Sequence, residues 1–294
     1  MRYRNQGGSA DTNDMTRKLL PIFIAAFLSC PAVGQDFPAY LKEHAVKIER
    51  LDSLSKQVYD LLTDNRLLMI GEMHGTNEPA QFVTGLAELF ASNGDSVQIG
   101  FEIPSNQMTT YLKLRTDSSI YQSDFFFKNK TDGRASKAWA AAISRISRIS
   151  KAQVFFYDVN GNYDNDRDSL MYLTIKNKLM EHPAWKTITI SGNIHNMLLP
   201  RKGQYKTAYY LSKDNELNLG DNLCSLNNRY QKGTASNNRG NGLQAYDMGN
   251  IESDYSTTVD FDNYLFLFPI NYYDTYDGVI FTRTITASAL ANEK

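Results

Sequence analysis

The segment LLMIGEMHGTNEP, residues 67–79, places a carboxylate and an imidazole two residues apart, Glu72 and His74, directly after an apolar run. A carboxylate can fix the tautomer of a neutral imidazole, which can then take a proton from water. The same residue types are also ligands of divalent metal ions. The spacing does not separate these two chemistries, although it differs from the i, i+4 histidine pair of a zinc-protease helix.

Comparable polar residues follow three further apolar segments. Glu102 ends SVQIGFE, Asp158 lies near the end of AQVFFYDV, and Asn193 ends KTITISGN, with His195 just beyond it. If these segments are parallel strands, their carboxyl ends meet at one edge of a sheet, where sites of such proteins form. We therefore expect a shared rim that contains Glu72, His74, Glu102 and His195.

The elements that must position this rim alternate between strand and helix. Buried strands are predicted at 66–72, 96–102, 152–159 and 186–193, and the segments between them have helical periodicity. This order predicts a single three-layer α/β domain over residues 35–294, with a mainly parallel sheet and helices on both faces.

Two helices are predicted near the start of this domain. Residues 37–63 have a roughly helical spacing of apolar positions. The next helix follows the first strand, with Asn77 as its N-cap, Pro79 in its first turn and Gly94 at its end.

The pattern breaks in the second half of the chain. TAYYL, residues 207–211, has the character of a short fifth strand. Residues 213–250 are rich in Asn and Gly, which predicts an insertion that is either a lid or a disordered loop. The segments NYLFLFP and YDGVIFTRTITAS then return to strand character.

The N-terminal region has the features of an export signal. A basic start after Met15, an apolar core at 19–28 and small residues before Gln35 predict a signal peptide over residues 1–34, cleaved after Gly34. Residues 1–14 are then either an over-extended start before Met15 or a long n-region. We expect a periplasmic or secreted protein with no transmembrane span after cleavage. Lipidation at Cys30 is the alternative, although FLSC is a poor lipoprotein box.

Composition excludes several classes of function. The 31 Lys and Arg residues against 32 Asp and Glu leave no basic surplus for nucleic acid. No phosphate-binding glycine loop and no G-x-S-x-G nucleophile motif are present, which disfavours serine catalysis. Cys224 would be the one cysteine of the mature chain and is expected to be an inert thiol.

The ordered motifs IGEMHGTNE, GFE, RDSLM, GNIHN and YDGVIFTRTITASA resemble the superfamily that unites erythromycin esterases, ChaN-like haem-binding lipoproteins and Tiki-type metalloproteases. The resemblance covers roughly residues 66–285. It implies site roles for Glu72, His74, Glu102 and His195, and it adds Arg167, the arginine that opens the helix after the third strand. Erythromycin esterases commonly have Glu-x-x-His where this chain has Glu-Met-His, so macrolide specificity is not implied.

Three functions are consistent with these observations. The first is an exported hydrolase of an ester or related acyl bond of a small-molecule substrate, with His74 as general base and Glu72 as its orienting partner. Arg167, Asp158 and Asn193 are then expected to bind the substrate. The second is a metalloenzyme of the same fold, with a divalent metal held by Glu72, His74, Glu102 and His195. The third is a haem- or metal-binding uptake protein without turnover, in which His or Tyr ligates the iron.

Overall fold

One sheet of nine strands organises the residues that the computed structural model describes. These residues are 36–114, 120, 123–129, 133–159, 167–240, 242–269 and 274–292. The predicted signal peptide, its cleavage position and Cys30 lie outside them. Within the described ranges, no helix is both long and apolar enough to cross a membrane.

The centre of the sheet is parallel. Its strand order is β1-β8-β9-β6-β2-β5-β3-β4, and every neighbouring pair from β9 to β4 is parallel. The parallel strands are β9 (Gly278–Ile285), β6 (Leu223–Asn238), β2 (Leu67–Glu72), β5 (Lys186–Gly192), β3 (Val97–Pro104) and β4 (Ala152–Asp158).

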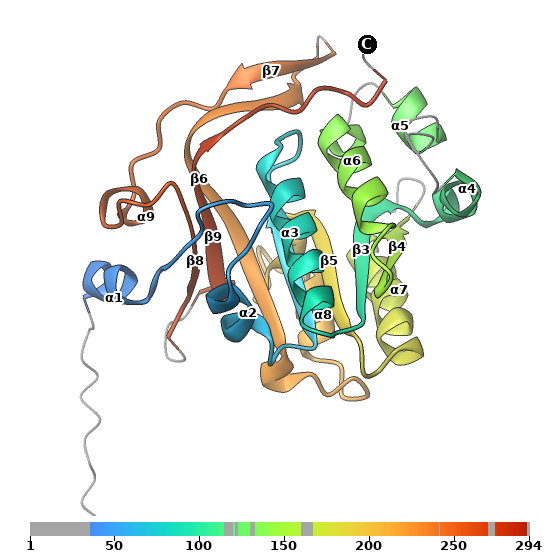
Figure 1. The fold of residues 1–294 in the computed structure, drawn as a ribbon, viewed down its shortest axis with the longest axis horizontal. Helices are drawn as coiled ribbons and strands as arrows, with labels where there is room; N and C mark the ends of the chain where they lie inside the picture. The colour runs from blue at the N-terminus through green and yellow to red at the C-terminus, as the bar shows by residue number, and fades with distance from the viewer. Residues whose placement is uncertain are drawn as a thin grey trace, which may run out of the picture. The chain divides into compact units, whose positions relative to one another are not determined.

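Antiparallel strands extend the sheet beyond this centre. At one edge, β8 (Asn263–Leu267) pairs with β9, and β1 (Val46–Lys47) pairs with β8. The far half of β6 also pairs with β7 (Leu243–Asp247), which curls over the end of the sheet (Figure 1).

Helices cover both faces of the parallel strands. Successive residues of a strand point to opposite faces, and apolar strand residues are buried on both faces. Leu68 and Ile70 of β2 pack in one core with α2 (Lys56–Leu62), α3 (Glu78–Ser92) and α6 (Lys137–Ile146). Leu67 and Met69 pack in a second core with α7 (Arg167–Glu181) and α8 (Thr207–Ser212). Figure 1 shows α3 and α6 side by side over the first face.

Smaller elements complete the structure. A third core lies where α1 (Phe37–His44) and the residues near α9 (Asp254–Thr257) cover β8 and β9. The remaining helices are α4 (Met108–Leu114) and α5 (Asp124–Lys128). The 3-10 turns are η1 (Ser105–Gln107), η3 (Gly133–Ala135), η4 (Asn193–Asn196) and η5 (Gly220–Asn222).

The predicted three-layer α/β fold is confirmed, and the four predicted strands are β2, β3, β4 and β5. The helix after the first strand, α3, has Asn77 at its N-cap position and Pro79 in its first turn, as predicted. The Asn77 side chain, however, donates to Thr286 Oγ1 and the Ala287 carbonyl, and it accepts no capping hydrogen bond from the helix.

The single helical stretch predicted at 37–63 is wrong. The chain forms α1, then β1, then α2. Helical periodicity is interrupted because Val46 and Lys47 pair with β8, and the Ile48 amide donates to the carbonyl of Asn263. Pairing with a strand more than 200 residues away in sequence is a tertiary effect that local spacing does not report.

Two predictions for the second half are also wrong. TAYYL belongs to a helix, α8, and not to a strand. Residues 213–250 are neither a lid nor a disordered insertion, because they contain β6 and β7. The first residues of β6, from Leu223 to Asn228, are buried between β2 and β9. The Asn-rich composition gave no strand signal, although β6 forms hydrogen bonds to β2 and to β9.

The position of β6 leads to a stability prediction. Leu226 is fully buried in the first core. Leu226→Ala should lower the free energy of unfolding by about 2–5 kcal/mol, because it removes buried methyl groups and leaves a cavity. Chemical denaturation checks this, with Leu173→Ala as control, since Leu173 on α7 is 48% exposed and its loss should change stability by less than about 0.5 kcal/mol. Equal stability of the two variants would contradict a core role for β6.

Candidate active site

Glu72 and His74 form a hydrogen-bonded pair at the carboxyl end of β2. His74 Nδ1 lies 2.8 Å from Glu72 Oε1, and the indole Nε1 of Trp139 on α6 donates to Glu72 Oε2 at 2.8 Å. Both oxygens of this buried carboxylate therefore have a partner. The His74 side chain is 39% exposed, and its Nε2 has no hydrogen-bond partner among the described residues. Glu72 thus fixes the ring and leaves Nε2 available to a ligand or water.

A glycine lets His74 approach Glu102 across the end of an intervening strand. Because β5 lies between β2 and β3, His74 after β2 and Glu102 near the end of β3 lie on either side of the last residue of β5. That residue is Gly192, whose amide donates to Glu102 Oε2 at 2.8 Å. A Cβ at this position would lie 3.1 Å from His74 Nε2 and 3.9 Å from Glu102 Oε2. A side chain at position 192 would therefore enter the space between His74 and Glu102.

Glu102 is the buried centre of the cluster. Its side chain is 3% exposed, and Oε1 accepts from Arg134 and Arg167 and lies 3.8 Å from His195 Nε2. Burial raises the pKa of such a carboxyl, but the nearby His74, His195 and two guanidinium groups outweigh burial and hold the pKa of Glu102 well below its usual range. Glu102 therefore remains ionised.

Asp158, at the end of β4, shares the same two arginines. Arg134 Nη1 donates to Asp158 Oδ2 at 2.7 Å, and Arg167 donates through Nε and Nη2 at 2.8 Å each. Burial lowers the pKa of Arg167, whereas its hydrogen bond to Asp158 and the charge of Glu102 raise it, and the net shift is upward. The Asp158 residue is 2% exposed, so it holds the arginines rather than facing a substrate.

The second histidine is held at both ring nitrogens. His195 Nδ1 lies 2.7 Å from Asp168 Oδ1, and Nε2 lies 3.0 Å from Arg167 Nη1. Arginine has only donors, so Nε2 must accept and the ring proton must sit on Nδ1. Thr207 also donates to Asp168 through its amide and its hydroxyl. His195 is therefore held in orientation by a partner at each ring nitrogen, in contrast to His74.

The charges of this cluster explain why the pKa of His74 is raised. Four carboxylates, on Glu72, Glu102, Asp158 and Asp168, face the three cations of Arg134, Arg167 and Lys206. A proton on His74 completes the balance. Partial burial lowers the pKa of His74, but the charge and hydrogen bond of Glu72 and the charge of Glu102 dominate and raise it to about 9.

The four rim residues do not fit a divalent metal ion. Arg134 and Arg167 both donate to Glu102 Oε1, and Arg167 also occupies His195 Nε2, so a metal cation between these residues would meet two fixed positive charges. Among the described residues, no three His, Cys, Asp or Glu side chains are grouped so that they could hold a metal. Of the two rim histidines, His74 alone has a ring nitrogen that could reach haem iron.

The structure thus brings together six of the predicted site residues, namely Glu72, His74, Glu102, Asp158, Arg167 and His195. Asn193 is different. Its amide group donates to the Asn228 carbonyl and accepts from the Asn228 amide, which ties η4 to β6.

Cys224 is buried, and burial raises the pKa of its thiol, in keeping with an inert role.

Sequence reasoning missed four residues of the cluster, namely Arg134, Trp139, Asp168 and Lys206. Arg134 and Trp139 come from η3 and α6, far from any strand end, and were counted only as part of a helical stretch. Asp168 follows Arg167 directly, so its position in the RDSLM motif was the one available signal. Arg134 and Trp139 had no comparable signal, because their approach depends on how α6 packs on the sheet.

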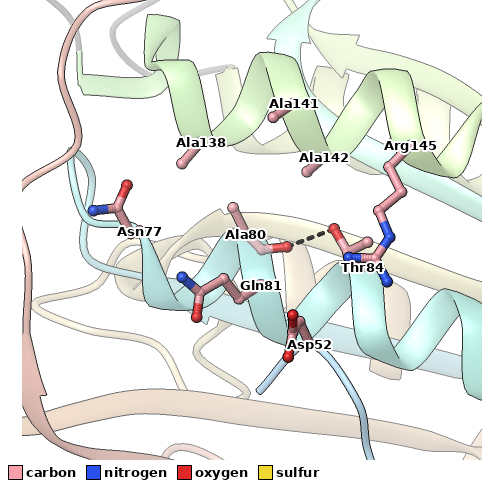
Figure 2. A pocket seen from close by; sticks show the side chains of 9 residues that line it. All are labelled: Asp52, Asn77, Ala80, Gln81, Thr84, Ala138, Ala141, Ala142 and Arg145. Atoms are coloured by element: carbon pink, nitrogen blue, oxygen red, sulfur yellow. Dashed lines mark hydrogen bonds between the residues drawn. The ribbon is translucent and has the colours of Figure 1, made fainter. Parts of the chain in front are cut away.

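A separate hollow lies between α3 and α6. Its volume is about 330 Å³, and Figure 2 shows alanines of α6 facing α3 across it, with Arg145 at one end. Arg145 pairs with Glu88, which joins the two helices. None of the polar strand-end residues lines this hollow, so it is not part of the candidate active site. The residues that line it are Asp52, Asn77, Ala80, Gln81, Thr84, Ala138, Ala141, Ala142 and Arg145.

Comparison with known proteins places the fold. No family model and no curated protein matches the sequence. Solved structures do match. A protein from Bacillus cereus has a TM-score of 0.64 at 10% identity, over 86% of this chain and 98% of its own. A succinoglycan biosynthesis protein has a TM-score of 0.65 at 9% identity, over 88% and 99%. A mutant of the erythromycin esterase EreC, in its open conformation, has a TM-score of 0.57 at 11% identity, over 82% and 97%.

These likenesses define an α/β protein with the fold of the erythromycin esterase structure. The fold that the motif resemblance implies is therefore confirmed. Identities of this size carry no activity or substrate from one protein to the other.

The Glu72–His74 pair leads to a prediction for the titration of His74. Glu72→Gln keeps an oxygen for Trp139 but removes the negative charge, so the pKa of His74 should fall from about 9 toward its ordinary value of 6.5. An NMR titration of the imidazole resonances measures this. Glu88→Gln is the matched control, because Glu88 pairs with Arg145 at the surface. An unchanged His74 titration in Glu72→Gln would contradict the assigned cause.

Proposed function

We propose that this protein hydrolyses an ester or a related acyl bond of a small-molecule substrate. The observation that carries the proposal is how the two ring nitrogens of His74 are placed. Its Nδ1 is fixed by the buried Glu72, while Nε2 is free and lies beside the ionised Glu102 at the carboxyl end of the sheet. This is the geometry that a general base needs.

In the proposed reaction, the neutral His74 takes a proton from water through Nε2. The water oxygen attacks the acyl carbon, and the carbonyl oxygen becomes negatively charged. When the tetrahedral intermediate collapses, the imidazolium returns that proton to the leaving oxygen, which yields a carboxylic acid and an alcohol. Glu72 keeps its charge throughout and stabilises the imidazolium.

The other residues have supporting roles in this mechanism. Glu102 Oε2 lies on the His74 side of the cluster and is placed to orient the attacking water. The guanidinium group of Arg167 is 30% exposed and stands beside His195, where it can offset charge that develops on the acyl oxygen. Asp168 and His195 hold that arginine in position.

The name of one structural relative supports the choice of an ester bond. The erythromycin esterase shares this fold, although at 11% identity. The Glu-Met-His spacing differs from the Glu-x-x-His of those enzymes, so we propose the bond class and not a macrolide substrate. Metal-dependent hydrolysis gains no comparable support, since Glu102 and His195 already pair with guanidinium groups. Haem carriage would depend on His74 alone among the two rim histidines.

The mechanism predicts a specific pH dependence. The imidazolium of His74 cannot accept a proton, so kcat/KM on a simple acetate ester should rise with pH and level off above about 9, where the ring becomes neutral. His74→Ala should lower kcat by roughly 10²–10⁴-fold, the usual contribution of a positioned acid–base group. Initial rates measured in a pH-stat check both expectations.

The matched control is His44→Ala. His44 is exposed on α1, where its Nδ1 lies 3.0 Å from the Tyr40 carbonyl oxygen, and its removal should leave the rate unchanged. Full activity in His74→Ala, or a rate that falls as the pH rises toward 9, would rule out His74 as the general base.

We also propose that the protein is exported, on the basis of the N-terminal sequence alone. Cleavage after Gly34 would leave a mature chain that begins at Gln35. Expression in a bacterial host followed by N-terminal sequencing of the periplasmic or secreted protein should therefore read Gln35 first. A diacylglyceryl group on Cys30 would instead identify an anchored lipoprotein, and a chain that retains residues 15–34 would contradict export by cleavage.

A further inference from the structure

A polar pocket of about 200 Å³ adjoins His195. Arg167 and Asp168 line it, and the same two side chains hold the ring nitrogens of His195, so the pocket borders the candidate active site directly. The rest of the lining comes from the segment before α8 and from that helix. It consists of Gly203, Gln204, Tyr205, Lys206 and Tyr210.

The pocket presents a donor and an acceptor close together. Lys206 Nζ lies 3.2 Å from Asp168 Oδ2 and 3.3 Å from Gln204 Oε1. Both distances are longer than the 2.7–2.9 Å of a strong charge-assisted hydrogen bond. Asp168 Oδ1, by contrast, already serves His195 and Thr207. The ammonium group and Oδ2 therefore retain capacity for a ligand.

The charges in the lining select against charged ligands. An anion would approach the carboxylate of Asp168, and a cation would approach Lys206 and Arg167. A neutral hydroxyl group can accept from Lys206 and donate to Asp168 Oδ2 at the same time. The lining is thus complementary to an uncharged group that carries hydroxyls.

An exposed aromatic ring forms another wall. Tyr205 is 48% exposed and stacks on Tyr209 with ring centroids 4.6 Å apart. It also contacts the edge of Tyr210, which packs against Tyr172. These contacts hold the ring of Tyr205 in place, so an apolar surface is available to a ligand at a low cost in conformational entropy.

We propose that this pocket binds a glycosyl group of the substrate, so that the scissile acyl bond is an ester on a sugar. Sugar C–H groups would lie on Tyr205, and sugar hydroxyls would pair with Lys206, Asp168 and Gln204. A pocket of 200 Å³ is smaller than the roughly 300–1,000 Å³ of drug-sized ligand pockets, which suits one sugar ring. The proposal rests on the proposed hydrolase function.

The kinetic test compares acetate esters that differ in one group. They are methyl glucoside, galactoside and mannoside acetylated at the primary hydroxyl, cyclohexylmethyl acetate, and an acetate ester that carries a carboxylate. At least one sugar ester should have a kcat/KM about tenfold or more above that of the cyclohexylmethyl ester, because the analogue leaves polar groups of the pocket unpaired.

Variants locate this preference in the pocket. Tyr205→Ala should reduce the preference to near unity, mainly through KM, whereas Tyr205→Phe keeps the ring and most of the preference. Tyr246→Ala, on β7 and outside the pocket lining, is the control and should behave as the wild type does. Ester hydrolysis without a sugar preference, or with a preference for the anionic ester, would overturn the proposal and leave the hydrolase function standing.

A binding measurement separates the two proposals. Saturation-transfer NMR with the unacetylated methyl glycosides as probes needs no turnover. A signal that Tyr205→Ala abolishes and Tyr246→Ala keeps would support the sugar pocket even if no ester is hydrolysed, in which case the hydrolase function fails alone. Absence of both hydrolysis and glycoside binding would overturn both.

Discussion

The buried, ionised carboxylate of Glu102 is the interaction on which the rest of the site depends. An unpaired charge at such a position would be strongly destabilising, so each neighbouring element supplies a partner. Arg134 comes from η3, Arg167 from α7 and the Gly192 amide from β5. The requirement to pair this one charge thereby fixes loops and helices from separate parts of the chain around a single point.

The two histidines beside this carboxylate differ in the partners of their ring nitrogens. His195 is saturated, with Asp168 on one ring nitrogen and Arg167 on the other, so it can position its neighbours but has no free atom for chemistry. His74 has a carboxylate on one nitrogen, and the other has no hydrogen-bond partner among the described residues. The local charge balance favours its proton, and a substrate that buries the ring further would favour releasing that proton.

The order of the strands makes this division possible. Since β5 separates β2 from β3, His74 after β2 and Glu102 near the end of β3 lie on either side of the end of β5, where Gly192 has no side chain between them. On the other side of His195, the same rim continues into the pocket lined by Lys206 and Tyr205. The proposed general base and the proposed sugar pocket therefore both belong to this edge of the sheet.

The sequence by itself determined the strands β2 to β5 and the residues at their ends, because buried parallel strands leave apolar runs and a parallel sheet must bring their carboxyl ends to one edge. It did not reveal β6, whose Asn-rich sequence is stabilised by strands on both sides, nor the break between α1 and α2, which depends on pairing with β8. Only the tertiary structure decided that Arg134 and Trp139 join the site and that Asn193 serves β6 instead. Those contacts depend on how helices and loops pack over the sheet, and a local sequence pattern does not report that packing.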